Sequence, residues 1–186
     1  MSEKSYVFTS ARLGFRNWLE EDVDIFSSMN ADPQVMEFFP NLLTAEQTKA
    51  FVKTMQVEFF ERGFCYFAVD ELESGNFIGF IGLHQQTFEA SFTPCIDIGW
   101  RLHPYVWNKG LATEGASSCL KYAYHVLGIQ EVYAIAPKVN IPSEQVMKKI
   151  GMKKITNFYH PLLEKDLRLR ECVVYKITGL EFTKCL

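Results

Sequence analysis

The 186-residue sequence lacks the patterns that mark membrane-spanning, disulfide-stapled and metal-binding proteins. It contains no run of about 18 uncharged apolar residues, as a membrane span would need, and the first residues, Met1 to Ser5, are polar, unlike a signal peptide. The five cysteines form no Cys-x-x-Cys pair and the four histidines form no His-x-x-x-His motif. We therefore expect free thiols, no metal, no membrane partner and a cytoplasmic location.

The sequence also lacks a large excess of charge of either sign. With 19 Lys and Arg against 22 Asp and Glu, the formal net charge is -3, so no long-range field would attract a nucleic acid. The sequence contains no repeat, low-complexity tract or Gly- and Pro-rich linker. The hydrophobic fraction of 48% is that of an ordinary globular protein, and the length fits one core. We predict a single domain over 1–186, with no direct nucleic-acid partner.

The order of the predicted elements indicates an α/β (α+β) fold with a mixed sheet. Three middle strands, the first two joined by a turn at 73–76, favour an antiparallel meander, and a later strand-helix-strand order implies one parallel crossover. A capping box of Thr44 and Gln47 begins a helix that Gly63 ends. Periodicity predicts strands over 11–18, 64–69, 77–84, 95–102, 131–136, 152–160 and 172–178, and helices over 20–29, 44–63, 113–127 and 143–150.

The segment from Tyr105 to Glu114 carries the strongest chemical signal. It joins a strand to a helix start through a loop that contains Gly110, and a helix start presents unpaired N–H groups and a partial positive charge. Small residues at Gly110 and Ala112 would let a pyrophosphate approach, with Lys109 as a nearby cation. The alternative is a plain left-handed turn. A P-loop does not fit, because Lys109 precedes its glycine, and no G-x-G-x-x-G is present.

The residues 107–114, Trp-Asn-Lys-Gly-Leu-Ala-Thr-Glu, resemble the Arg/Gln-x-x-Gly-x-Gly/Ala acetyl-CoA loop of the GNAT N-acetyltransferases. Trp in the first place is typical of the Rim-type branch, the ribosomal-protein N-terminal acetyltransferases. Further matching segments span most of the chain: 11–16, 21–22, 32–35, 78–83, 99–104, 140–143 and 148–152.

This resemblance implies a GNAT-type fold, a mixed and mostly antiparallel central sheet flanked by helices, in which the parallel crossover carries the acetyl-CoA loop. Acetyl-CoA is then the co-substrate. The backbone of 100–102 would bind pantetheine and the amides of 108–113 the pyrophosphate. The residues implied for acetyl-CoA binding are Trp100, Arg101, Leu102, Trp107, Asn108, Lys109, Gly110, Leu111, Ala112, Thr113 and Asn140.

The catalytic residues that the resemblance implies are Asp97 and Ser143. The tyrosine that often serves as general acid falls at Met147, which cannot donate a proton, and Ser143 is the substitute beside the sulfur. Asp97 matches an acidic position on the central strand and would be the base, directly or through water. Two structural alternatives stay open: Ser143 supporting a helix N-terminus, and Asp97 pairing with Arg101 on the same strand face.

The acceptor site is the least determined part of this hypothesis. Phe38 and Phe39 lie in a region that forms one acceptor wall in the family, although core packing explains them almost as well. His84, at a predicted strand end, is an alternative base, or an ordinary structural histidine.

We expect direct acetyl transfer to a primary amine in a ternary complex, at the N-terminal α-amino group of a ribosomal or other protein. An α-amino group has a pKa near 8, against about 10.4 for lysine, and so demands less of a weak base. Two alternatives remain. One is a small-amine acetyltransferase for a polyamine, amino acid or antibiotic, with acidic groups such as Glu37, Glu89 or Glu164 around the cleft. The other is a non-catalytic acyl-CoA-binding module. The oligomeric state is a monomer or homodimer.

Overall fold

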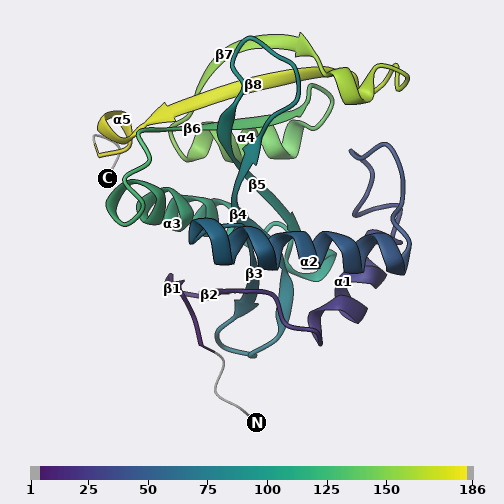
Figure 1. Cartoon of the computed structure of the whole chain (residues 1–186), viewed down its shortest axis with the longest axis vertical. Helices are drawn as coiled ribbons and strands as arrows, with labels where there is room; N and C mark the ends of the chain where they lie inside the picture. Colours follow the sequence, from purple (N-terminus) through teal and green to yellow (C-terminus); the bar gives the residue numbers. More distant parts are fainter. Residues whose placement is uncertain (1–4, 184–186) are drawn as a thin grey trace.

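An eight-stranded sheet with the order β1-β2-β3-β4-β5-β6-β8-β7 organises the chain, in a computed structural model that describes residues 5–183 (Figure 1). The strands are β1 Phe8–Thr9, β2 Leu13–Arg16, β3 Tyr66–Glu71, β4 Phe77–Gln86, β5 Cys95–Leu102, β6 Glu131–Pro137, β7 Lys153–Tyr159 and β8 Glu171–Thr178. The helices are α1 Asp22–Asn30, α2 Ala45–Arg62, α3 Leu111–His125, α4 Ile141–Lys149 and α5 Gly179–Thr183, with 3-10 turns at Pro104–Val106 and Pro161–Leu163.

The pairing of the strands confirms the mixed sheet. Every neighbouring pair is antiparallel except β5 and β6, which are parallel and joined through α3. The predicted meander β3-β4-β5 and the predicted crossover are therefore both present. Helix α2 begins and ends as its sequence indicates, because the Thr44 side chain accepts from the Gln47 amide while the Gln47 side chain accepts from the Thr44 amide, and Gly63 caps the end.

Several predicted boundaries were wrong. The first strand was predicted over 11–18 but ends at Arg16, because the Asn17 side chain caps the Trp18 amide and the Trp18 indole donates to the carbonyl of Tyr66. Helix α4 begins at Ile141, two residues before the predicted start, because Asn140 caps it. The two-residue strand β1 and the five-residue helix α5 were missed, since segments so short have no readable periodicity.

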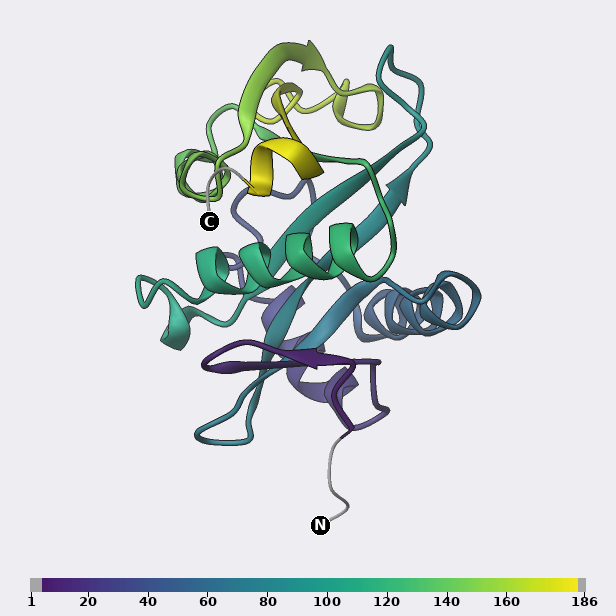
Figure 2. The same cartoon turned by 90° about the vertical axis from the view of Figure 1, so that its left-hand side faces the viewer.

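Alternation along β4 separates the two faces of the sheet. Ile81 points to α3, because its Cδ1 lies against Gly115 and would meet a Cβ added there. Phe80 and His84 point to the opposite face, where Phe51 of α2 contacts the Phe80 ring. Figure 2 shows α2 and α3 on opposite sides of these strands. Residues 80, 82 and 84 of β4 thus share the face covered by α1 and α2.

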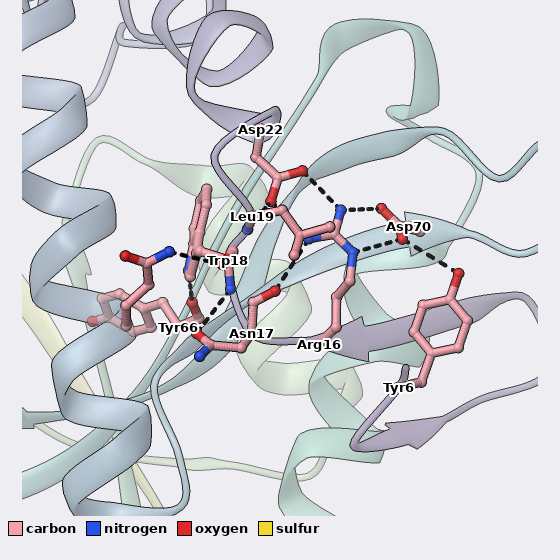
Figure 3. A network of polar contacts seen from close by, with 9 residues as sticks. Tyr6, Arg16, Asn17, Trp18, Leu19, Asp22, Tyr66 and Asp70 are labelled. Carbon is pink, nitrogen blue, oxygen red and sulfur yellow. Dashed lines mark hydrogen bonds and ion pairs between the residues drawn. The ribbon is translucent and has the colours of Figure 1, made fainter. Parts of the chain in front are cut away.

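A buried ionic network ties β2, β3 and the start of α1 together (Figure 3). The Arg16 guanidinium donates to both carboxylate oxygens of Asp22 at 2.6 and 2.8 Å, and to both of Asp70 at 2.8 and 2.7 Å. Its remaining N–H bonds the carbonyl of Asn17, and Tyr6 donates to Asp70. All five donors of Arg16 are satisfied, so the cation is fully used in holding these elements together.

The described residues also bear on three expectations from the sequence, which concern membrane-spanning helices, metal-binding clusters and disulfides. Within 5–183, no helix is long and apolar enough to cross a membrane, and no cluster of three or more His, Cys, Asp or Glu side chains could hold a metal ion. The cysteines at 65, 95, 119 and 172 are buried free thiols. The fifth, Cys185, lies outside the described residues.

Candidate active site

Strand β5 diverges from its parallel neighbour. It pairs with β4 over its whole length, from Cys95 to Leu102, but with β6 it is in register only at Asp97 and Tyr133. Residues 98–102 therefore have a strand edge without a β6 ladder, and this edge includes residues 100–102, which the resemblance implies for pantetheine. Leu102 differs from its neighbours, because its carbonyl already accepts the Trp107 indole N–H at 2.7 Å. Trp107 thus fastens the following loop to the end of β5.

The loop between β5 and α3 presents a run of unpaired backbone amides. Asn108 and Gly110 both adopt left-handed backbone conformations, with φ of 61° and 78°, which asparagine and glycine tolerate best. From Asn108 to Thr113, no amide N–H has a hydrogen-bond acceptor within the described part of the chain. The space over Gly110 is open, since the nearest atom to an added Cβ would be 3.8 Å away. The start of α3 is therefore a cradle for an anion.

The turn between β1 and β2 contacts the start of α3 and the loop before it. Glu114, in the first turn of α3, accepts from the Ser10 hydroxyl at 2.7 Å and from the Arg12 amide and Nε at 2.8 and 2.7 Å. Burial alone would raise the pKa of Glu114, but these hydrogen bonds outweigh burial and lower it. Arg12 also donates to the carbonyl of Lys109. Sequence reasoning gave no role to Arg12, which adds a second cation beside the loop.

Asp97 is buried, with 5% of its surface exposed, and accepts the Tyr66 hydroxyl at 2.9 and 3.0 Å through its two oxygens. Burial raises the pKa of Asp97 to about 6, even though the bond from Tyr66 acts in the opposite direction. No ion pair joins Asp97 to Arg101 in the described structure, so the alternative of a simple pair with Arg101 was wrong. The carboxylate faces α1 and α2 with only neutral direct donors.

Tyr66 is the main functional candidate that sequence reasoning missed. Its side chain lies over Gly99, where an added Cβ would come within 3.0 to 3.2 Å of two ring carbons and the hydroxyl oxygen, and its hydroxyl reaches Asp97. Gly82 lies closer still to the backbone of residues 65–67 at the start of β3. Glycines inside two predicted strands were the available signal, because they indicate close approach by another group.

His84 lies beside Asp97 in the β4–β5 register and pairs with Glu58 of α2 at 2.7 Å. Burial lowers the pKa of His84, but the hydrogen bond and charge of Glu58, helped by Asp97, raise it overall. Gln86 also contacts the Tyr66 hydroxyl at 3.4 Å. The structure thus places His84 next to Asp97 across the two strands, and adds Glu58 as an acidic group that was not anticipated.

The predicted acid, Ser143, lies in the first turn of α4. The Asn140 side chain accepts a hydrogen bond from the Ser143 amide at 3.1 Å. The cap of α4 is therefore the side chain of Asn140, and Ser143 contributes only its backbone N–H. The Ser143 hydroxyl has no hydrogen-bond partner among residues 5–183, which argues against a capping role for that hydroxyl. Met147 is buried at 2% exposure and carries no proton donor.

The two predicted acceptor-wall aromatics point to different neighbours. Phe39 stacks on the Arg101 guanidinium, with 3.9 Å between the guanidinium carbon and the ring centre. Phe38 lies 6.0 Å from the Arg168 guanidinium, and Arg168 also donates to the carbonyl of Glu37. The segment between β7 and β8 therefore contacts the segment between α1 and α2. Phe39 belongs to the Asp97 face, and Phe38 to this inter-segment contact.

Comparison with known proteins agrees with this geometry. Residues 12–153 match the acetyltransferase (GNAT) domain family. The chain belongs to the GNAT acetyltransferases. An uncharacterised N-acetyltransferase of Bacillus subtilis (strain 168), YnaD, is 31% identical over 147 residues, which cover 78% of this chain and 82% of that protein. A Bacillus anthracis GNAT-family acetyltransferase structure superposes with a TM-score of 0.77 at 26% identity, over 93% of this chain and 98% of the other.

A spermidine N-acetyltransferase from Vibrio cholerae, solved with CoA and spermine, has the same fold at a TM-score of 0.75 and 14% identity, over 93% of this chain and 99% of that one. GNAT enzymes use acetyl-CoA as co-substrate, and the residues present here fit it. The unpaired amides of 108–113 and the open space over Gly110 suit a pyrophosphate, and Lys109 and Arg12 supply positive charge beside it.

Proposed function

We propose that this GNAT enzyme acetylates the N-terminal α-amino group of a protein or peptide, with acetyl-CoA and acceptor bound together. The observation that carries the proposal is the buried Asp97 carboxylate, whose pKa of about 6 leaves it mostly ionised at neutral pH yet able to accept a proton. An α-amino group with a pKa near 8 is neutral in roughly a tenth of molecules at pH 7, whereas a lysine side chain is almost wholly charged.

In this mechanism the amine nitrogen forms the new C–N bond as the C–S bond of the thioester breaks. Asp97 accepts the proton that the nitrogen loses, and the Tyr66 hydroxyl orients the Asp97 oxygens. Ser143 donates its hydroxyl proton to the departing thiolate and regains one from solvent. His84, which lies across the strand from Asp97 and pairs with Glu58, is the alternative base. Residues 100–101 and 108–113, with Lys109 and Asn140, would hold acetyl-CoA.

The Rim-type assignment rests on Trp107 in the acetyl-CoA loop and is part of the same proposal, as is a ribosomal protein as acceptor. A polyamine is the second candidate, because Asp97 and Glu58 place two carboxylates on the acceptor face. The likeness to the spermidine enzyme concerns the fold. The cation of Arg101 on the same face argues against a polycation.

The direct test is acetyl-CoA turnover with three acceptors: an N-terminal peptide, the same peptide with a blocked N-terminus and one lysine, and spermidine. We expect the free N-terminus to react with the highest kcat/KM. A higher kcat/KM for spermidine would replace the first candidate by the second.

Acetyl-CoA at a hundred times its Kd should stabilise the folded protein by about 2.7 kcal/mol, measured as a rise in Tm. Gly110→Val should remove most of this rise, because a branched side chain opposes the left-handed backbone and fills the open space over the loop. ATP and NAD serve as controls and should have little effect. An unchanged Tm of the wild type with acetyl-CoA would contradict the assigned binding loop.

A further inference from the structure

The side chain of Arg101 is a cation without a carboxylate partner. Within residues 5–183 its only hydrogen bond is from Nη1 to the side-chain oxygen of Asn30, at 2.6 Å. Its Nε is fully buried and bonds nothing. Arg16, in contrast, has a partner for each of its five donors. Unused donors on a largely buried guanidinium call for an explanation, and a ligand that accepts hydrogen bonds is one.

The surroundings of Arg101 hold it in place without neutralising it. Phe39 stacks at 3.9 Å, and the rings of Phe80 and Phe26 lie at 5.5 and 5.8 Å. Asn30 donates its amide N–H to Thr48, which turns the Asn30 oxygen toward the guanidinium. This is an aromatic setting with one neutral acceptor. An anionic ligand would therefore stabilise the positive charge of the Arg101 guanidinium in this setting.

Arg101 shares a strand face with Asp97. The two residues are four apart on β5, so their side chains point to the same side, with about 13 Å between their Cα atoms. Between them, the Tyr66 ring covers Gly99 and stacks on Phe80 at 4.9 Å. One face of β5 thus has an anionic end at Asp97 and a cationic end at Arg101, separated by an aromatic floor.

We propose that Arg101 binds a carboxylate of the acceptor, and that the preferred acceptor is a primary amine with a carboxylate two to four residues away. An extended peptide covers about 3.5 Å per residue, so two to four residues span about 7 to 14 Å, and the distance along β5 lies at the long end of this range. The inference rests on the proposed function and names the acceptor class. The carboxylate has two sources, the C-terminus of a short peptide or an acidic side chain close behind a protein N-terminus.

The first experiment compares matched acceptors with the wild-type enzyme. Alanyl-glycyl-glycine is tested against its C-terminal amide, and a longer C-terminally amidated peptide with glutamate at its third position is tested against the glutamine version. All four react through the same kind of α-amino group. We expect kcat/KM to be about tenfold higher for the acid form in one or both pairs, since a charge-assisted bond is gained. The pair that shows the preference identifies the source of the carboxylate.

The second experiment separates binding from a structural role. Arg101→Gln should bring the acid-to-amide ratio of kcat/KM to about 1, and Arg101→Lys should retain part of the preference. A residue that only held Phe39 in place would change both forms equally and leave the ratio intact. Arg168→Gln is the matched control, because Arg168 also faces an aromatic ring, that of Phe38, and should leave the ratio unchanged.

The outcomes are distinguishable. Peptide acetylation with a wild-type acid-to-amide ratio near 1 in both pairs, or a ratio that Arg101→Gln leaves unchanged, overturns this inference alone. No acetylation of any of the four peptides overturns the proposed function and this inference with it. The ratio is measured on one enzyme preparation at a time, so partial unfolding of a variant does not affect it.

Discussion

Two buried clusters in this molecule each contain carboxylates, yet their charges are balanced differently. At Arg16, burial acts to lower the pKa of the guanidinium, but the hydrogen bonds that it donates to Asp22 and Asp70 raise its pKa overall. At Asp97, burial dominates and raises the pKa to about 6, because the direct donor is the neutral hydroxyl of Tyr66. A carboxylate locked to a guanidinium supports the fold, whereas one with only a neutral donor can exchange a proton.

The largest expected effect tests the second cluster. Asp97→Asn should lower kcat/KM by roughly 10² to 10⁴-fold near pH 7, since general base catalysis is lost. Part of the rate should return near pH 9, where solvent deprotonates the amine. The wild-type rate should rise with pH through about 6, as Asp97 loses its proton, and the variant should lack that rise. A wild-type profile without this rise would show that Asp97 is not the base.

Removing the cation of the first cluster should affect stability instead. Arg16→Met removes the guanidinium that bonds both Asp22 and Asp70 and should lower the unfolding free energy by about 3 to 5 kcal/mol, measured by urea denaturation. Lys109→Met is the control, because Lys109 is exposed and should change stability little. A loss below about 1 kcal/mol for Arg16→Met would refute the structural assignment.

Ser143 is the other proposed catalytic residue. Unlike that of Asp97, its side chain has no hydrogen-bond partner within the described residues. Ser143→Ala should lower kcat by roughly 10- to 1,000-fold with little change in the KM for acetyl-CoA, since protonation of the leaving thiolate is lost. Its Tm should stay near that of the wild type. Asn140→Ala is the control for the cap and should cost about 1 kcal/mol. Full kcat with a lower Tm in Ser143→Ala would assign the hydroxyl to helix support.

The smallest expected effect is on the pH dependence of stability. Because the pKa of Asp97 is raised by folding, the native state holds a proton that the unfolded chain releases between about pH 4 and 6. Stability from this group is present at low pH and falls as pH rises through 6, by about 2 to 3 kcal/mol. Asp97→Asn should lack that fall and be more stable than the wild type at pH 7.5. Urea midpoints at pH 4.5 and 7.5 measure the difference, and identical pH dependence would contradict the raised pKa.

Local signals explain what the sequence predicted well. The capping box at Thr44 and the glycine at 63 define α2 because both act within one helical turn. The loop 107–114 was identifiable because its amides, glycine and helix start are contiguous in the chain. The cluster around Asp97 was not identifiable, because Tyr66 and Asp97 are 31 residues apart and Glu58 and His84 are 26 apart.

The sequence by itself therefore determined the mixed sheet, the crossover and the position of the loop 107–114 before α3, since turn residues, caps and periodicity act over a few residues. Only the tertiary structure decided the partners of the charged groups. Asp97 and Arg101 share a strand face, but Tyr66 occupies the space over Gly99 between them and bonds Asp97, while Asn30 and Phe39 contact Arg101. Which side chain fills that space depends on how β3 and α1 pack on β5, and packing between distant segments leaves no local pattern.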